Sequence, residues 1–247
     1  MSIENTFDLE SEEILKPENL AQRIENFPEI AVATFNDKII NLVADWPDAR
    51  IISEVNHRNV YEIEHKGKKI AVYRTDIGGA ASAGMLELMI VKGVKKFVFF
   101  GACGTLDKDI SAGNFIVPTA AYRDEGTSYH YLKAGDYVEI KTAEKLSQIM
   151  RELKLPYIKA KTWTTDAIFR ETRNNMLKRK SEGCVAVEME CASVMAAGQF
   201  RGVEVYQFIY GEDNLDSSEW ERRTMGNVTL ETRERYLYIA LDIASMI

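Results

Sequence analysis

Side chains that form disulfides or bind metals are scarce in this sequence. Its 247 residues include three histidines and three cysteines, and Cys103, Cys184 and Cys191 stand at irregular spacing. An odd, irregular set of this kind gives neither a disulfide framework nor a zinc pattern. We therefore expect buried cysteines in a reducing compartment, no metal ion and no organic cofactor.

A basic excess and a long apolar run are missing as well. The formal net charge is −7, whereas a surface that follows nucleic-acid phosphates needs a surplus of basic side chains. No stretch reaches the length of a bilayer span, and the first residues are acidic and lack the apolar core of a signal peptide. These absences argue against nucleic-acid and membrane partners and predict a cytoplasmic protein.

The pattern that is present is typical of one α/β domain. Residues 1–28 are polar, acidic and contain two prolines, so we expect an arm there, and the domain proper spans residues 29–247. Short strand-like apolar runs alternate with segments whose apolar residues recur at helical intervals. Without a Rossmann fingerprint or a P-loop, this alternation predicts a single domain with a central mixed, partly parallel sheet flanked by helices.

The expected elements can be given by residue range. Strands are predicted at residues 30–35, 50–55, 60–65, 70–75, 97–100, 115–117, 157–165 and 203–210, and helices at 82–96, 142–155, 187–200 and 230–247. Ligands of such folds bind at the carboxyl ends of strands. Chemistry is therefore expected after Phe100, where Gly101–Gly104 is predicted as a glycine-rich loop, after Thr165 and after Tyr210.

Two carboxylates stand at the start of the predicted helix 187–200, whose next residues are small or apolar. Acidic residues in a first turn can simply complement the helix dipole, and for Glu188 this interpretation is as good as a functional one. An ionised carboxylate can also hold two hydroxyls of a sugar diol, which we expect of Glu190. Met189 would then form an apolar wall against the sugar ring.

A third carboxyl group, Asp213, follows the strand 203–210 and is expected to project from a loop into the same crevice. It could also belong to an ordinary turn. A partly buried aspartate has a raised pKa, and a protonated carboxyl group is suited to donate a proton to a departing nucleobase. His130, in a stretch rich in polar and aromatic residues, is either a site residue or a surface histidine.

In their order and spacing these motifs resemble the nucleoside phosphorylase superfamily, especially its uridine phosphorylase branch and the hexameric bacterial purine enzymes. No single piece is specific, but together they extend over roughly residues 30–245. The matching pieces are Asn56-His57-Arg58, Ile77-Gly78-Gly79, Gly101-Ala102-Cys103-Gly104, Arg123 to His130, Thr165 to Phe169 and Val187-Glu188-Met189-Glu190.

The resemblance implies a pentosyltransferase that cleaves the N-glycosidic bond of a nucleoside with inorganic phosphate as co-substrate, giving free base and ribose 1-phosphate. It implies catalytic roles for Asp213 and Glu190. Ribose would be bound by Met189, Glu190, Glu188 and His130, the base by Ile168, Phe169, Arg170 and Arg173, and phosphate by Arg58, Gly79, Gly101, Ala102 and Gly104. Arg58 matches an arginine that acts across a subunit boundary, so a homo-oligomer is expected.

The sequence departs from the family pattern at the phosphate site. Phe99 and Ala102 stand where the family has an arginine and a serine or threonine, and the glycine turn with its own arginine is missing around residues 33–38. Losing two arginines should weaken phosphate binding by several kcal/mol, at roughly 1.5–3 kcal/mol per charged hydrogen bond. Three outcomes remain open: phosphate is held by other groups such as Lys38, water replaces phosphate as in nucleosidases, or the protein only binds nucleosides.

The coexistence of Glu190 and Asp213 argues against a pure binding protein, because binding alone needs no acid. Purine and pyrimidine bases both remain open. Asp213 favours a purine slightly, since it can protonate a ring nitrogen.

Overall fold

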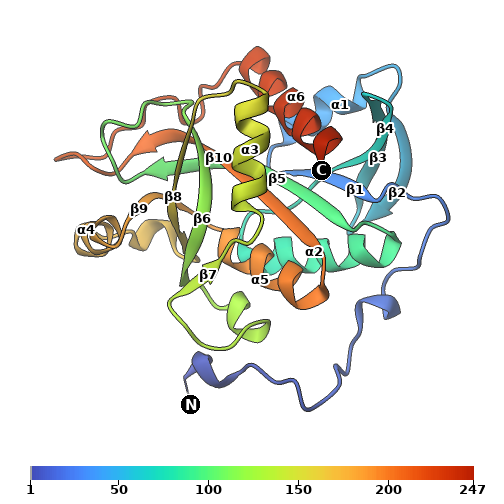
Figure 1. Cartoon of the computed structure of the whole chain (residues 1–247), viewed down its shortest axis with the longest axis horizontal. Helices are drawn as coiled ribbons and strands as arrows, with labels where there is room; N and C mark the ends of the chain where they lie inside the picture. Colours follow the sequence, from blue (N-terminus) through green and yellow to red (C-terminus); the bar gives the residue numbers. More distant parts are fainter. Residues whose placement is uncertain (1) are drawn as a thin grey trace.

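One ten-stranded sheet organises the chain in the computed structural model, which describes residues 2–247 (Figure 1). The strands follow the order β10-β6-β8-β9-β5-β1-β4-β3-β2, and β7 is added beside β6. Because β10 pairs with both β6 and β5, five of these strands close into a ring. The predicted mixed sheet in a single α/β domain is confirmed.

The strands are β1 (Ile30–Thr34), β2 (Arg50–Val55), β3 (Arg58–His65), β4 (Lys68–Arg74), β5 (Lys96–Thr105), β6 (Phe115–Asp124), β7 (Tyr137–Glu139), β8 (Tyr157–Thr165), β9 (Cys184–Glu188) and β10 (Glu204–Asn214). The α-helices are α1 (Asp37–Ala44), α2 (Gly79–Lys92), α3 (Ala143–Glu152), α4 (Arg173–Ser181), α5 (Cys191–Arg201) and α6 (Leu230–Met246).

Tight turns join β2, β3 and β4 into an antiparallel unit at one end of the sheet. Asn56 and His57 both have positive φ, at 48° and 60°, and Lys66 and Gly67 repeat this arrangement at 49° and 74°. Such φ values suit two-residue hairpin turns, whose twist matches that of the strands. Both connections are therefore two-residue hairpin turns, and they bring the predicted strands at residues 50–55, 60–65 and 70–75 together.

Helices cover both faces of the sheet (Figure 1). On one face α6 lies over β1 and β5 with α1 beside it, and Phe115 meets Phe208 and Tyr236 edge-on. On the other face α2 and α5 pack against each other. A Cβ on Gly79 would lie 2.1 Å from Ser193 Oγ, so the close approach of these two helices requires a glycine there.

The N-terminal residues lie outside the sheet and carry two short 3-10 helices, η1 (Ile3–Asn5) and η2 (Pro17–Asn19). Figure 1 shows this arm running along the surface below α2 and α5. Within residues 2–247, no helix is long and apolar enough to cross a membrane.

Two expectations about local structure near the site were wrong. Gly101–Gly104 is not a loop, because β5 continues to Thr105 and remains paired with β10. The helix expected from residue 187 begins at Cys191, since β-branched Val185 and Val187 form β9 instead. Glu190 is therefore the N-cap residue of α5.

Candidate active site

The predicted acids belong to chain segments that the sheet brings close together, where β10, β5 and β9 are neighbours. Asp213 of β10 pairs in register with Gly104 of β5, which in turn pairs with Val187 of β9. Strands lie about 4.8 Å apart, so the chain segment after Val187 lies roughly two strand spacings from Asp213. The sheet thus brings Asp213 and the Glu188–Glu190 segment to one place.

Asp213 does not project from a loop, as expected from the sequence, but from β10 itself. A β-bulge between Gly211 and Asp213 shifts the register there, which turns the side chain to the face of Gly104. Burial raises its pKa, and a hydrogen bond from Trp220 Nε1 to Oδ2, 2.7 Å long, opposes this rise. The result is a half-buried carboxyl group that keeps its proton to higher pH than an exposed aspartate.

Glu171 is a further carboxyl group beside Asp213 that the sequence did not single out. It lies between the 3-10 helix η4 (Ile168–Arg170) and α4, and it is half-buried. Burial, and then the negative charge of Asp213, raise its pKa to about 7. No local signal marks this pairing, because the two residues are 42 positions apart in the chain.

Glu190 is buried beside the start of α2. Its Oε1 accepts a hydrogen bond of 2.6 Å from the backbone N–H of Gly78. Burial, and then the nearby Glu188, raise the pKa of Glu190 to about 8. The unliganded protein therefore holds this carboxyl group protonated at neutral pH, and a sugar diol would meet both a donor and an acceptor on it.

This protonation predicts a pH-dependent stability. Folded Glu190 binds its proton up to about pH 8, whereas unfolded glutamate releases it near the ordinary pKa of 4.5. The resulting stabilisation is complete below pH 4.5 and is lost as the pH rises to 8. Urea unfolding should show a decline of roughly 2–4 kcal/mol over this range, and Glu190→Gln should flatten it. An equally steep decline in the variant would contradict the assignment.

Glu188 is occupied with holding the start of α5 in place. Its Oε2 accepts from the backbone N–H groups of Glu190, at 2.8 Å, and Cys191, at 2.6 Å. Its Oε1 accepts from Thr164 Oγ1 at 2.6 Å and from Thr162 Oγ1 at 3.4 Å. A carboxylate has about four acceptor positions, so a direct contact with ribose would require one of these bonds to break.

The residues predicted for the base lie in η4 and at the first residue of α4, on either side of Glu171. Ile168 is 42% exposed and Phe169 is 95% exposed. Arg173 donates a hydrogen bond of 3.0 Å to the carbonyl of Ser218, which ties this segment to the loop after β10. Arg170 is exposed, and Met189, predicted as the sugar wall, is half-buried. These open apolar side chains form a rim that a flat heterocycle could cover.

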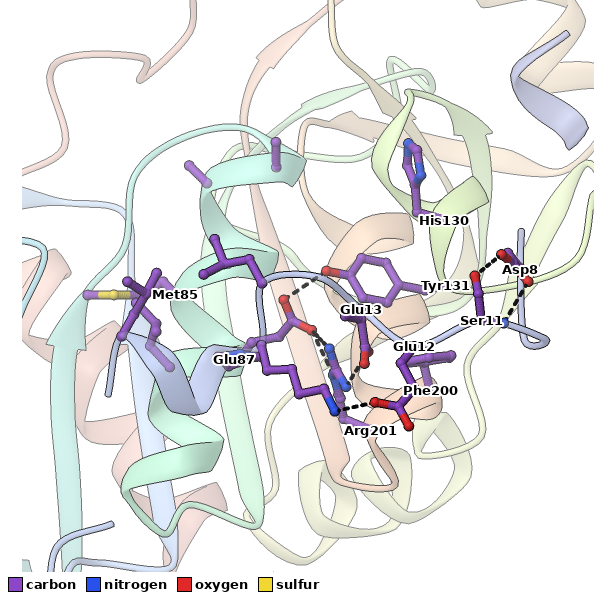
Figure 2. A pocket seen from close by; sticks show the side chains of 18 of the residues that line it. Asp8, Ser11, Glu12, Glu13, Met85, Glu87, His130, Tyr131, Phe200 and Arg201 are labelled. Atoms are coloured by element: carbon purple, nitrogen blue, oxygen red, sulfur yellow. Dashed lines mark hydrogen bonds and ion pairs between the residues drawn. The ribbon is translucent and has the colours of Figure 1, made fainter. Parts of the chain in front are cut away.

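A cavity of about 710 Å³ lies under the N-terminal arm, away from the two predicted catalytic acids (Figure 2). The arm, α2 and the end of α5 line it, and Arg201 there forms ion pairs with Glu13 and Glu87 at 2.9 and 2.6 Å. His130, predicted for ribose, lies at its edge and is exposed. His130 therefore faces the arm side of the molecule, and its predicted ribose contact stays a prediction.

The sequence profile described as "Phosphorylase superfamily" matches residues 29–240 of this chain. The chain belongs to the phosphorylase superfamily. The resemblance noted from its motifs is thereby confirmed.

Relatives within the phosphorylase superfamily are distant. A guanosine phosphorylase of Halorubrum lacusprofundi is 24% identical over 195 residues, covering 76% of this chain and 79% of that protein. A DeoD-type purine nucleoside phosphorylase of Aliivibrio fischeri is 26% identical over 231 residues, covering 85% and 92%. The crystal structure of an AMP nucleosidase from Bacteroides thetaiotaomicron matches with a TM-score of 0.73 and 18% identity over 90% and 89% of the two chains, a likeness of fold.

Proposed function

We propose that this member of the phosphorylase superfamily cleaves the N-glycosidic bond of a nucleoside, with Asp213 as the acid that protonates the departing base. The observation that carries the proposal is the half-buried Asp213, whose pKa burial raises, on the same sheet edge as the buried carboxyl group of Glu190. A protein that only bound nucleosides would have no use for a proton donor at this position.

The proposed roles are those that the family resemblance implies for each group. Glu190 holds the ribose diol, with Met189 against the sugar ring. Ile168 and Phe169 cover the base, and Asp213 supplies a proton to a ring nitrogen as the C1′–N bond breaks. A ring nitrogen basic enough to take this proton is present in purines, so a purine nucleoside is the proposed substrate class.

Glu171 supports the same proposal. Its carboxyl group, with a pKa of about 7, lies close enough to Asp213 for the charges to interact. With a pKa of about 7, Glu171 still carries a proton on about half of the molecules at neutral pH, so the pair of carboxyl groups can hold a proton there. This proton is available when a base departs.

The proposal is tested by incubating the whole protein with a panel of purine and pyrimidine nucleosides and measuring free base by chromatography. Each nucleoside is assayed with and without inorganic phosphate, so that either acceptor is allowed. We expect free base from a purine nucleoside, and roughly 10²–10⁴-fold slower release of it when Asp213 is replaced by asparagine. If no nucleoside yields free base under either condition, while the protein is folded by circular dichroism, the proposal is wrong.

A further inference from the structure

The segment predicted to cradle phosphate has the wrong backbone conformation for an anion. A phosphate-binding loop presents several N–H groups in a turn that is free of strand pairing. Here Gly101, Ala102, Cys103 and Gly104 are residues of β5 and pair in register with β10, and Gly104 pairs with β9 as well. The backbone of residues 101–104 is therefore engaged in strand pairing and does not form an anion-binding turn.

The ring of Phe35 lies where the side chain of residue 101 would point. A Cβ placed on Gly101 would be 2.8 Å from Cδ2 of Phe35. The Phe35 ring is tilted against that of Phe99, with 6.3 Å between centroids, and Phe99 is fully buried. Two aromatic rings therefore occupy the region in which the family pattern has an arginine, and they offer no donor to an anion.

The other residues predicted to contact phosphate, Gly79, Gly104 and Ala102, are also poorly suited to bind it. Gly79 faces Ser193, and a Cβ on Gly104 would lie 3.2 Å from the carboxyl oxygen Oδ1 of Asp213. Ala102 is exposed but has only a methyl group. None of these three positions offers a charged donor.

The two arginines near this edge are neutralised by carboxylates. Arg58 forms an ion pair with Asp76. Arg74, the last residue of β4, pairs with Asp37 through Nε at 2.7 Å and with Asp76 through Nη1 at 3.1 Å. Two positive and two negative groups give this cluster no net charge, so it lacks the excess positive potential that attracts phosphate.

The N-terminus of α1 is also unsuited to bind an anion. The side chain of Asn36 accepts the backbone N–H of Lys38 at 2.9 Å, and Asp37 places a carboxylate in the first turn. Both features use the positive end of the helix dipole that an anion would otherwise occupy.

From these contacts we infer that the acceptor in the reaction is water, and that Phe35 together with the Arg58–Asp76–Arg74 cluster excludes phosphate from this site. The inference rests on the proposed function and specifies its second substrate. The oxygen of water bonds to C1′ as the C1′–N bond breaks, the bond's electron pair leaves with the base, and Asp213 protonates the base. The surplus proton of the water passes to solvent, and the products are free base and ribose.

The test measures cleavage of a purine nucleoside by the full-length protein at several phosphate concentrations, with ribose 1-phosphate sought by phosphorus NMR and free ribose measured by a reducing-sugar assay. The expected result is an unchanged rate when phosphate is added and no ribose 1-phosphate. A rate that rises and saturates with phosphate, accompanied by ribose 1-phosphate, overturns the inference but leaves the proposed function standing. Absence of cleavage under all conditions instead removes the proposed function, and the inference falls with it.

A binding measurement checks the inference without relying on turnover. Isothermal titration of the protein with inorganic phosphate should show no saturable binding at millimolar concentration. The double variant Phe35→Ala, Asp76→Asn opens the space over Gly101 and frees Arg58, so it should gain saturable binding. The matched control Phe35→Ala, Asp48→Asn opens the same space but removes an exposed carboxylate elsewhere, and it should gain none.

Two results of the titration would overturn the inference. One is saturable phosphate binding by the unmodified protein. The other is a folded Phe35→Ala, Asp76→Asn variant that binds phosphate no better than its control, which would show that these residues do not exclude the anion.

Discussion

Replacement of Asp213 by asparagine should lower kcat by roughly 10²–10⁴-fold, the range typical of losing a general acid. Asparagine has nearly the same shape and can still accept the hydrogen bond from Trp220 Nε1, but it has no proton to give to the base. Stability should change little, because the aspartate is only half-buried. Steady-state release of free base and urea unfolding measure the two quantities.

The matched control is Asp216→Asn, three residues further along, where Lys180 forms an ion pair with the carboxylate. This variant removes a carboxylate from the same region and should retain most of the activity. The pH profile gives a second readout: activity of the unmodified protein should fall on the alkaline side, as Asp213 loses the proton that burial helps it keep. Near-normal turnover of Asp213→Asn would remove the assigned role.

Replacement of Glu188 by alanine should destabilise the protein by at least about 3 kcal/mol. The estimate combines the loss of a helix cap, about 0.5–2 kcal/mol, with about 1–3 kcal/mol for each buried group left without a partner. The N–H groups of Glu190 and Cys191 and the hydroxyl of Thr164 would all lose their acceptor. Urea unfolding with a constant m-value measures the effect.

Glu182→Ala serves as the control for that prediction. It also removes a glutamate near β9, but one whose side chain is 31% exposed and paired with Arg179, so the loss of stability should be smaller. The assignment would be wrong if the Glu188→Ala variant were as stable as the unmodified protein but had a strongly raised KM. That result would indicate that Glu188 binds the sugar and does not stabilise the start of α5.

Elements with strong local patterns could be predicted from the sequence. The strands at residues 50–55 and 157–165 agree with β2 and β8 at both ends, because β-branched and aromatic residues are frequent there. Helices α1 and α4 were missed. In α1 only Ile39 and Val43 are buried, and α4 buries only Met176 and Arg179, so neither presents an apolar stripe long enough to recognise.

The candidate site was predictable in its acids but not in their surroundings. Glu190 stands out because it precedes a run of small and apolar residues, and Asp213 because it follows a predicted strand, where ligands of α/β folds bind. The partners that set their behaviour come from distant segments: Gly78 donates to Glu190, and Trp220 donates to Asp213. Likewise, the contact between Phe35 and Gly101 could not be predicted from the residues near Gly101, because the parallel pairing of β1 with β5 creates it.

The two proposed catalytic acids and the residues proposed to cover the base are held in place in different ways. Asp213 is fixed by the pairing of β10 with β5, whereas Ile168 and Phe169 belong to a short exposed turn connected to the neighbouring loop through one bond from Arg173. Substitutions or insertions in that turn can therefore accumulate without displacing Asp213, the proposed proton donor. In such a scaffold the choice of heterocycle can diverge during evolution while the bond-breaking step is inherited unchanged.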